Sequence, residues 1–202
     1  MKLIVTLLLF LNISLYADSD LILRGAYGTS SASDFDQLYT FTGLNTSPFN
    51  TSVYNLALGK RFVENFYGLP IDFSVNGGVS YFDENAYQDN FLEATLYVKM
   101  YIKLNLFSNQ FRYGIAEGVS YAGKVPWVEA QEAIVEGDNQ SNLLNYMEMT
   151  FDFDIGKLIH VKSMHNLYLG YLIKHRSGAK GTYGGVYDGG SNYNALYLEK
   201  NF

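Results

Sequence analysis

The chain has 202 residues, a formal net charge of −6 and no cysteine. This length suits one domain, and the acidic balance argues against nucleic acid as a partner, which requires a basic surface. Without cysteine, neither a disulfide framework nor a thiolate metal site can form. Tyrosine and phenylalanine are abundant, at 18 and 14 residues. Tyrosine suits a membrane interface, because its ring lies in lipid while its hydroxyl reaches water.

The N-terminus predicts a secretory signal peptide over residues 1–17. Lys2 precedes an apolar run too short to cross a bilayer, and the small residue Ala17 is followed at once by Asp18. We expect cleavage after Ala17 and a single domain over residues 18–202, with an uncleaved N-terminal anchor as the alternative. Beyond this segment, no stretch approaches the roughly 20 apolar residues that a spanning helix needs. A membrane protein with this sequence would therefore cross the bilayer as a β-barrel.

Strict alternation predicts an all-β fold, an eight-stranded antiparallel transmembrane β-barrel of the outer-membrane type. Between residues 91 and 104 every even position is apolar, whereas the odd positions include Glu93 and Lys99. A helix would mix these two sets, while a strand keeps them on opposite faces. Carboxylates on the inner face fit a polar lumen better than a packed core, which favours a membrane barrel over a secreted soluble one.

The connections between the expected strands alternate in length. The strands lie near residues 20–29, 51–62, 69–82, 90–105, 110–122, 143–156, 166–177 and 191–202. The connections at one end, which include the longest, are 30–50, 83–89, 123–142 and 178–190, and those at the other end are 63–68, 106–109 and 157–165. Long outer loops and short periplasmic turns indicate the outer membrane of a Gram-negative cell. A short helix is expected from Trp127 to Glu136.

The end of the chain and the inner face support the same architecture. Phe202 shares a face with Leu196 and Leu198, which resembles the C-terminal signature of Gram-negative outer-membrane barrels. Inward-facing charges are expected to form salt bridges that fill a narrow lumen. They are Glu93, Glu117, Glu148, Asp152, Asp154, Glu199, Lys99, Lys103 and Arg61.

A candidate site lies at the outer end of the seventh expected strand. His175 and Ser177 project to one side of an otherwise apolar stripe. A serine beside an imidazole is the minimal nucleophile–base pair for acyl transfer. Glycines in and before the following loop would let backbone amides approach an oxyanion; they are Gly178, Gly184, Gly185, Gly189 and Gly190. The alternative is a basic rim of Lys174, His175 and Arg176 that contacts lipid A phosphates.

This arrangement resembles the lipid A 3-O-deacylase (PagL-type) family: a small outer-membrane barrel with His-x-Ser on the penultimate strand and a Gly/Asn-rich loop into the last. The resemblance implies an outer-membrane serine esterase that removes an ester-linked acyl chain from lipid A of lipopolysaccharide, without a cofactor. It implies Ser177 as the nucleophile and His175 as the general base. The family pattern also has an acid near the start of the last strand.

No carboxylate lies between residues 189 and 194, so the third member of the site would be Asn192 or Asp188. Hairpin register favours Asn192, and an amide can also orient an imidazole. Lys174, Arg176 and Asn194 are candidates for contacts with the lipid headgroup. His160 and His165 lie at the periplasmic end without nearby acids, so no metal site is expected there.

A second hypothesis is a non-enzymatic outer-membrane barrel with a structural or surface-interaction role. A pair of lumen-facing His175 and Ser177 side chains would favour this second hypothesis, because only an outward pair can meet a lipid ester.

Overall fold

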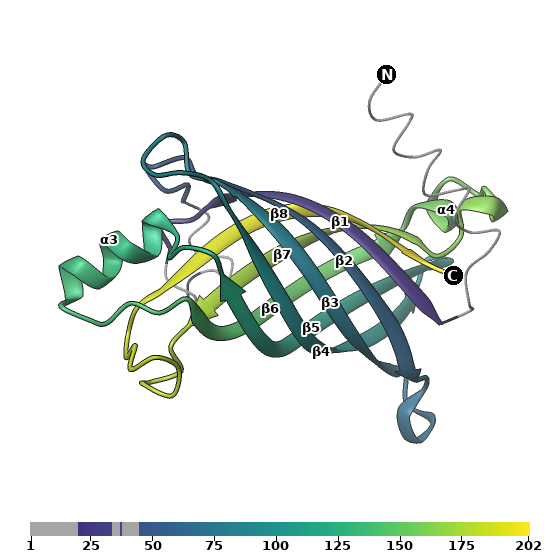
Figure 1. Ribbon diagram of the computed structural model, residues 1–202. Helices are drawn as coiled ribbons and strands as arrows, with labels where there is room; N and C mark the ends of the chain where they lie inside the picture. Colours follow the sequence, from purple (N-terminus) through teal and green to yellow (C-terminus); the bar gives the residue numbers. More distant parts are fainter. Residues whose placement is uncertain (1–19, 34–36, 38–44) are drawn as a thin grey trace.

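The computed structural model describes residues 20–33, 37 and 45–202, which form one closed antiparallel barrel with the strands in sequence order (Figure 1). The strands are β1 (Leu21–Ser30), β2 (Ser52–Val63), β3 (Ile71–Asp83), β4 (Phe91–Leu106), β5 (Asn109–Ala122), β6 (Leu143–Asp154), β7 (Leu167–Ser177) and β8 (Gly190–Asn201). The predicted fold class and all eight strands are confirmed. The predicted signal peptide lies outside the described residues.

Apolar side chains cover the outer surface of the barrel, and charged side chains lie inside it. Leu56 and Leu96 on the outer face are 60% and 58% exposed, whereas Glu93 and Lys99 on the inner face are each 1% exposed. This arrangement is the reverse of that in a water-soluble protein, where charged residues are almost never fully buried unless paired. The outer face is therefore suited to hydrocarbon. In the described part of the chain, no helix is long and apolar enough to span a bilayer.

Ion pairs and tyrosine hydroxyls fill the lumen. Glu148 accepts hydrogen bonds from Arg24 and Lys99, each at 2.6 Å. Arg112 holds Asp152 with two nitrogens, at 2.9 and 2.7 Å, and also donates to Glu199. Buried charges persist only where they are paired in this way. The lumen is thus crossed by salt bridges, as the alternating charges predicted.

Two of the carboxylates that were predicted to form salt bridges in the lumen do not form them. Glu117 lies on the exposed outer face of β5, opposite Met147 of β6. Side chains alternate between the two faces of a strand, and the odd-numbered residues in this part of β5 point outward. Asp154 accepts the backbone N–H groups of Lys157 and Asn166. It caps the turn after β6 rather than pairing with a lumen cation.

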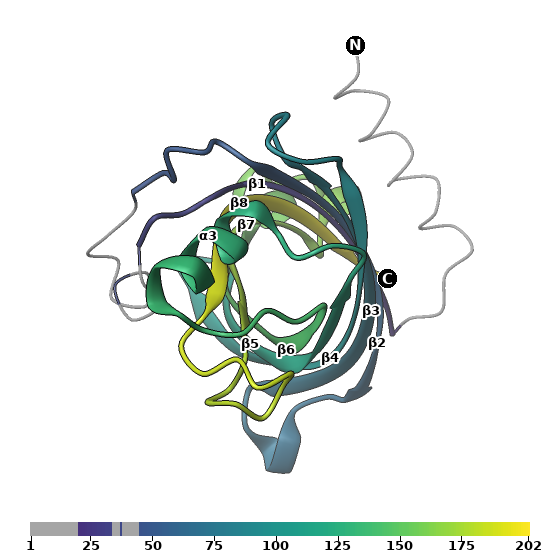
Figure 2. The same cartoon turned by 60° about the vertical axis from the view of Figure 1, so that its left-hand side comes forward.

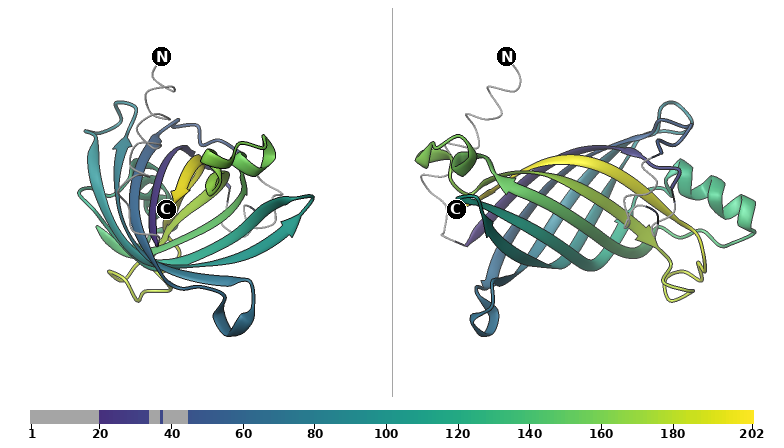
Figure 3. Two further views of the ribbon diagram at one scale, coloured as in Figure 1. Left: turned by 90° about the vertical axis from the view of Figure 1, so that its right-hand side faces the viewer. Right: turned by 180° about the vertical axis from the view of Figure 1, so that it is seen from behind.

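The two ends of the barrel differ in what they carry. The short helices η1 (Phe66–Gly68), α4 (Ile155–Leu158) and η2 (Lys162–Met164) lie at the end where the chain terminates (Figures 1 and 3). The helix α3 (Trp127–Glu136) lies at the opposite end, beside the long β7–β8 connection, and Figure 2 shows it at the rim of the barrel. Its bounds match the predicted helix. Strand β7 runs toward α3, so its last residues lie at the end with the long loops.

The helix α3 is bounded by residues that stop a helix at each side. It follows Pro126, whose missing N–H costs nothing at a helix start. It ends at Gly137, which has a φ of 69° and donates its N–H to the Ala133 carbonyl. That left-handed conformation is accessible to glycine without strain and closes the last turn. Two carboxylates of the helix then fasten it to β8: Glu129 accepts from the Ser191 hydroxyl and Glu132 from the Gly190 N–H.

Candidate active site on the outer face of the barrel

The register between β7 and β8 brings His175 directly opposite Asn192. Both residues belong to the outward-facing set of their strands, because their neighbours Lys174 and Tyr193 are fully buried on the lumen side. The His175 Nδ1 atom lies 2.7 Å from the Asn192 Oδ1 atom. Directly opposite residues in an antiparallel pair are the closest cross-strand neighbours, which places this contact within side-chain reach.

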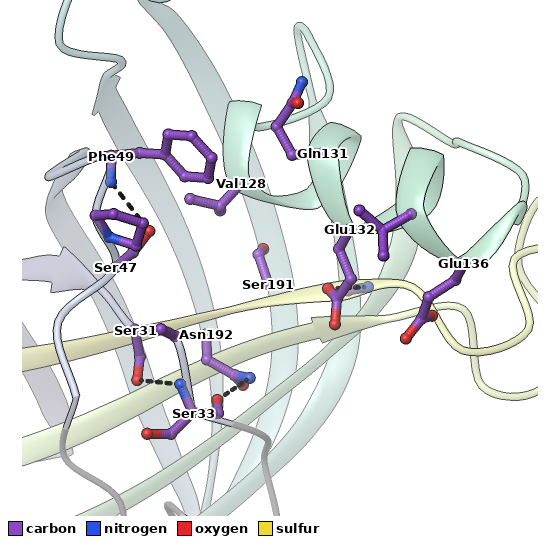
Figure 4. A pocket seen from close by; sticks show the side chains of 14 residues that line it. Ser31, Ser33, Ser47, Phe49, Val128, Gln131, Glu132, Glu136, Ser191 and Asn192 are labelled. Atoms are coloured by element: carbon purple, nitrogen blue, oxygen red, sulfur yellow. Dashed lines mark hydrogen bonds between the residues drawn. The ribbon is translucent and has the colours of Figure 1, made fainter.

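The orientation of the Asn192 amide determines which imidazole nitrogen carries the proton. Its Nδ2 atom donates to the carbonyl of Ser33 at 3.1 Å (Figure 4), so its Oδ1 atom faces His175 as an acceptor. The imidazole must then donate from Nδ1. This tautomer is assigned from the hydrogen-bond network. In this tautomer Nε2 carries no proton, which is the protonation state that activation of a nucleophile requires.

Ser177 shares the outward face of β7 with His175 and is only half-buried. Among the described residues, the hydrogen bond of the His175 ring is made to Asn192 and not to the Ser177 hydroxyl. The structure therefore joins the predicted base to the predicted third residue, and it places the predicted nucleophile beside them on the same strand. Activation of Ser177 by His175 would require a hydrogen bond between its hydroxyl and Nε2.

Asn145 is a polar neighbour of Ser177 that the sequence analysis missed. It lies directly opposite Ser177 on β6 and is buried, although its position in the strand faces outward. Side chains paired in this way have Cβ atoms about 4.5–5.5 Å apart, so the amide lies next to the hydroxyl. The signal in the sequence was a polar residue in the apolar register of the sixth strand.

Asp188, the alternative third residue, lies apart from His175 in the exposed part of the β7–β8 loop. Its backbone N–H donates to Asp138 at 2.8 Å. The same Asp138 oxygen accepts the N–H groups of Tyr187 and Gly189, at 2.7 and 3.0 Å. These amides, with that of Asp188 the strongest influence, lower the pKa of the Asp138 carboxyl to about 2. One carboxylate therefore holds the loop that connects Ser177 to Asn192.

Two of the glycines whose backbone N–H groups were predicted to approach an oxyanion donate those groups to carboxylates instead. The N–H of Gly189 donates to Asp138, and that of Gly190 donates to Glu132. Gly178 has a packing role, since a Cβ atom there would clash with the Val186 carbonyl oxygen. Gly184 and Gly185 adopt φ values of 60° and 71° and form the turn of the loop. The glycines therefore shape the loop, and the two amides nearest β8 bind carboxylates.

The predicted headgroup contacts by Lys174 and Arg176 are wrong. Adjacent residues of a strand point to opposite faces, so the neighbours of outward-facing His175 point into the lumen. Lys174 donates to Glu93 at 2.7 Å, and Arg176 lies 3.8 Å from both Glu93 and Glu129. The alternative of a basic lipid-facing rim fails for the same reason.

The third predicted headgroup contact, Asn194, does lie on the outward face. It accepts a hydrogen bond from the Tyr171 hydroxyl at 2.7 Å. His160 and His165 lie in the connection between β6 and β7, at the opposite end from His175. In the described part of the chain, no cluster of three or more His, Cys, Asp or Glu side chains could hold a metal ion.

Comparisons with known proteins agree with this architecture. No known protein family matches the sequence, and no curated protein matches it significantly. The fold is similar to the crystal structure of the outer membrane enzyme PagL, with a TM-score of 0.57, 12% identity, and coverage of 90% of this chain and 99% of that one. It is also similar to Neisserial surface protein A (NspA), with a TM-score of 0.51, 10% identity, and coverage of 92% and 98% respectively. At these identities the likeness extends to the fold, a small eight-stranded outer-membrane barrel.

Proposed function

We propose that this protein is an outer-membrane serine esterase that removes an ester-linked acyl chain from lipid A or a related lipid in the outer leaflet of a Gram-negative cell. The observation that supports this proposal most directly is the 2.7 Å contact between His175 Nδ1 and Asn192 Oδ1 on the outward face, beside Ser177. The fold resemblance to an outer-membrane enzyme supports the proposal. A pair of this kind inside the lumen would never meet a lipid ester.

In the proposed reaction, the Ser177 hydroxyl oxygen bonds to the ester carbonyl carbon while its proton moves to His175 Nε2. The bond to the lipid alkoxide then breaks, and that oxygen takes the proton from Nε2. Water repeats the sequence on the acyl-enzyme: it gives a proton to Nε2 and releases the acyl chain as a carboxylic acid, with Ser177 restored. Asn192 holds the imidazole in place, and the Asn145 amide donates to the oxyanion. No cofactor takes part.

Mass spectrometry of lipid A from a Gram-negative host tests this function directly. Overproduction of the wild-type protein should shift lipid A to a species that has lost one acyl chain. The Ser177→Ala variant should leave the lipid A of the host unchanged, because no nucleophile remains. Ser52→Ala, an outward-facing serine on β2 remote from His175, is the matched control and should act as the wild type does.

If wild-type protein is folded in the membrane and leaves the acylation pattern unchanged, the esterase proposal is wrong. The second candidate, a non-enzymatic surface barrel, then gains support from the resemblance to NspA, a surface protein of the same architecture.

A further inference from the structure

A cavity of about 320 Å³ opens at the loop end of the barrel, next to the candidate active site (Figure 4). Three segments form it: the connection after β1, the helix α3 and the start of β8. Asn192 lines the cavity and also bonds His175. A ligand in the cavity would thus lie one residue away from the imidazole.

The charged groups of the lining are acidic. Glu132 and Glu136 are four residues apart on α3, so they share one face of the helix, and Figure 4 shows both carboxylates pointing toward β8. Neither Lys, Arg nor His occurs among the described residues of the lining. Arg176, which directly follows His175, lies in the lumen beside Glu93 and Glu129. A phosphate group would therefore meet two carboxylates and no counter-charge.

The remaining lining combines hydroxyl groups with apolar surface. Four buried serines, Ser31, Ser33, Ser47 and Ser191, contribute polar positions to the lining. Phe49 and Val128 contribute an apolar wall. Phe49 is fixed there by edge-on contacts with the rings of Tyr87 and Trp127. Such a mixture of fixed aromatic surface and convergent polar groups suits a sugar ring, which has both C–H faces and hydroxyl edges.

We propose that this cavity binds an unphosphorylated sugar unit of the lipid that is cleaved at Ser177. The inference rests on the proposed function and specifies its substrate: the ring adjoining the scissile ester carries hydroxyl or amino groups, and its phosphates are absent or lie elsewhere. Glu132 and Glu136 accept from the sugar hydroxyls or pair with an amine. They also disfavour a phosphorylated ring by like-charge repulsion, which provides specificity.

Tryptophan fluorescence tests this inference without any need for hydrolysis. Trp127 is the single tryptophan of the chain and begins the helix that bears both carboxylates. The Ser177→Ala protein in a zwitterionic detergent would be titrated with glucosamine, N-acetylglucosamine and glucosamine 6-phosphate. We expect saturable changes with the first two sugars. The phosphorylated sugar should bind at least about tenfold more weakly, because like charges brought together oppose binding.

Charge reversal at Glu136 then tests whether the carboxylates of α3 cause the weaker binding of the phosphorylated sugar. Glu136→Lys, at an exposed position, should bring the affinity for glucosamine 6-phosphate to within about threefold of that for glucosamine. The matched control Glu64→Lys, an exposed carboxylate at the opposite end of the barrel, should leave the discrimination intact. The inference is overturned if no sugar gives a saturable change, or if the phosphorylated sugar binds the starting protein as tightly as glucosamine. If the protein distinguishes the sugars as expected but its wild-type form leaves lipid A intact, the esterase proposal is wrong and the inference about the cavity stands.

Discussion

Asn192 is the residue on which the proposed chemistry depends most, because it decides the protonation of the base. An amide can present either an acceptor or a donor to an imidazole, and only an acceptor at Nδ1 leaves Nε2 unprotonated. The Ser33 carbonyl resolves this choice by binding Nδ2. In the proposed mechanism, an asparagine held in this way takes the orienting role of the acid expected at this position.

Substitution at Asn192 provides the test at the residue scale. Asn192→Ala removes the acceptor of Nδ1, so kcat for ester hydrolysis should fall by about 10²-fold, the lower end of what a general base contributes. Asn192→Asp keeps an acceptor in place and should retain activity within about tenfold of wild type, since an acid can fill this role. The measurement is kcat and KM on a micellar ester.

Asp188→Asn is the control for the substitutions at Asn192. Its exposed side chain lies outside the contact between His175 and Asn192, so this change should leave kcat within about twofold of wild type. Loss of activity in Asp188→Asn together with normal activity in Asn192→Ala would exchange the roles of the two residues.

The sequence predicted the pair of His175 and Asn192 more fully than the groups around it. Alternation placed both residues on the outward face, and hairpin register indicated Asn192 as the next outward-facing residue after the loop, near His175. The structure adds that the two residues are directly opposite each other. The Ser33 contact was beyond prediction, because it joins residues 159 positions apart through an irregular loop. Alternation also implied that Lys174 and Arg176 point inward, so their assignment to the lipid surface contradicted the same rule that located His175.

At the scale of elements, the site depends on a loop held by groups from another part of the chain. Asp138, just beyond α3, binds three consecutive amides of the β7–β8 connection. Glu129 and Glu132 of α3 bind the first residues of β8. The helix was predictable from its own residues. Its use as an anchor was not predictable, because each anchoring hydrogen bond joins residues about 50 or more positions apart in the sequence.

Amide hydrogen exchange tests this anchor. In Asp138→Asn, the amides of Tyr187, Asp188 and Gly189 should exchange at least about tenfold faster, because they lose a charged acceptor and the loop opens locally. Asp89→Asn, a fully exposed aspartate of another loop, is the control and should leave their exchange unchanged. Equal protection in both variants would show that Asp138 is dispensable.

The pKa of Asp138 sets the pH range of the anchor. Its carboxyl has a folded-state pKa of about 2, below the ordinary value of about 4. A depressed pKa means that the stabilisation is present above the unfolded value and is lost as the pH falls through the folded value. Protection of the three amides should therefore be constant, after correction for intrinsic exchange, from about pH 5 to pH 8.

At the scale of the whole molecule, the barrel decides which side of the protein can react. Salt bridges such as Arg24–Glu148 and Lys174–Glu93 are buried in the lumen, so these charges are not accessible from the outer face of the barrel. Aromatic residues mark the interface at the loop end, where the rings of Tyr27 and Tyr54 lie 4.9 Å apart. The outward face of β7 places His175 and Ser177 at the loop end of the barrel, where the proposed esterase would meet an acyl ester of the outer leaflet.

Labelling by an activity-based phosphonate tests the central claim, that Ser177 is a nucleophile activated by His175 at the lipid surface. Wild-type protein in membranes would be treated with a fluorophosphonate bearing a long alkyl chain and with a short water-soluble analogue. Peptide mass spectrometry should find the label on Ser177, faster with the alkyl probe, and His175→Ala should abolish it. Unlabelled Ser177 in folded wild-type protein, or labelling that is equally fast in His175→Ala, would contradict the account.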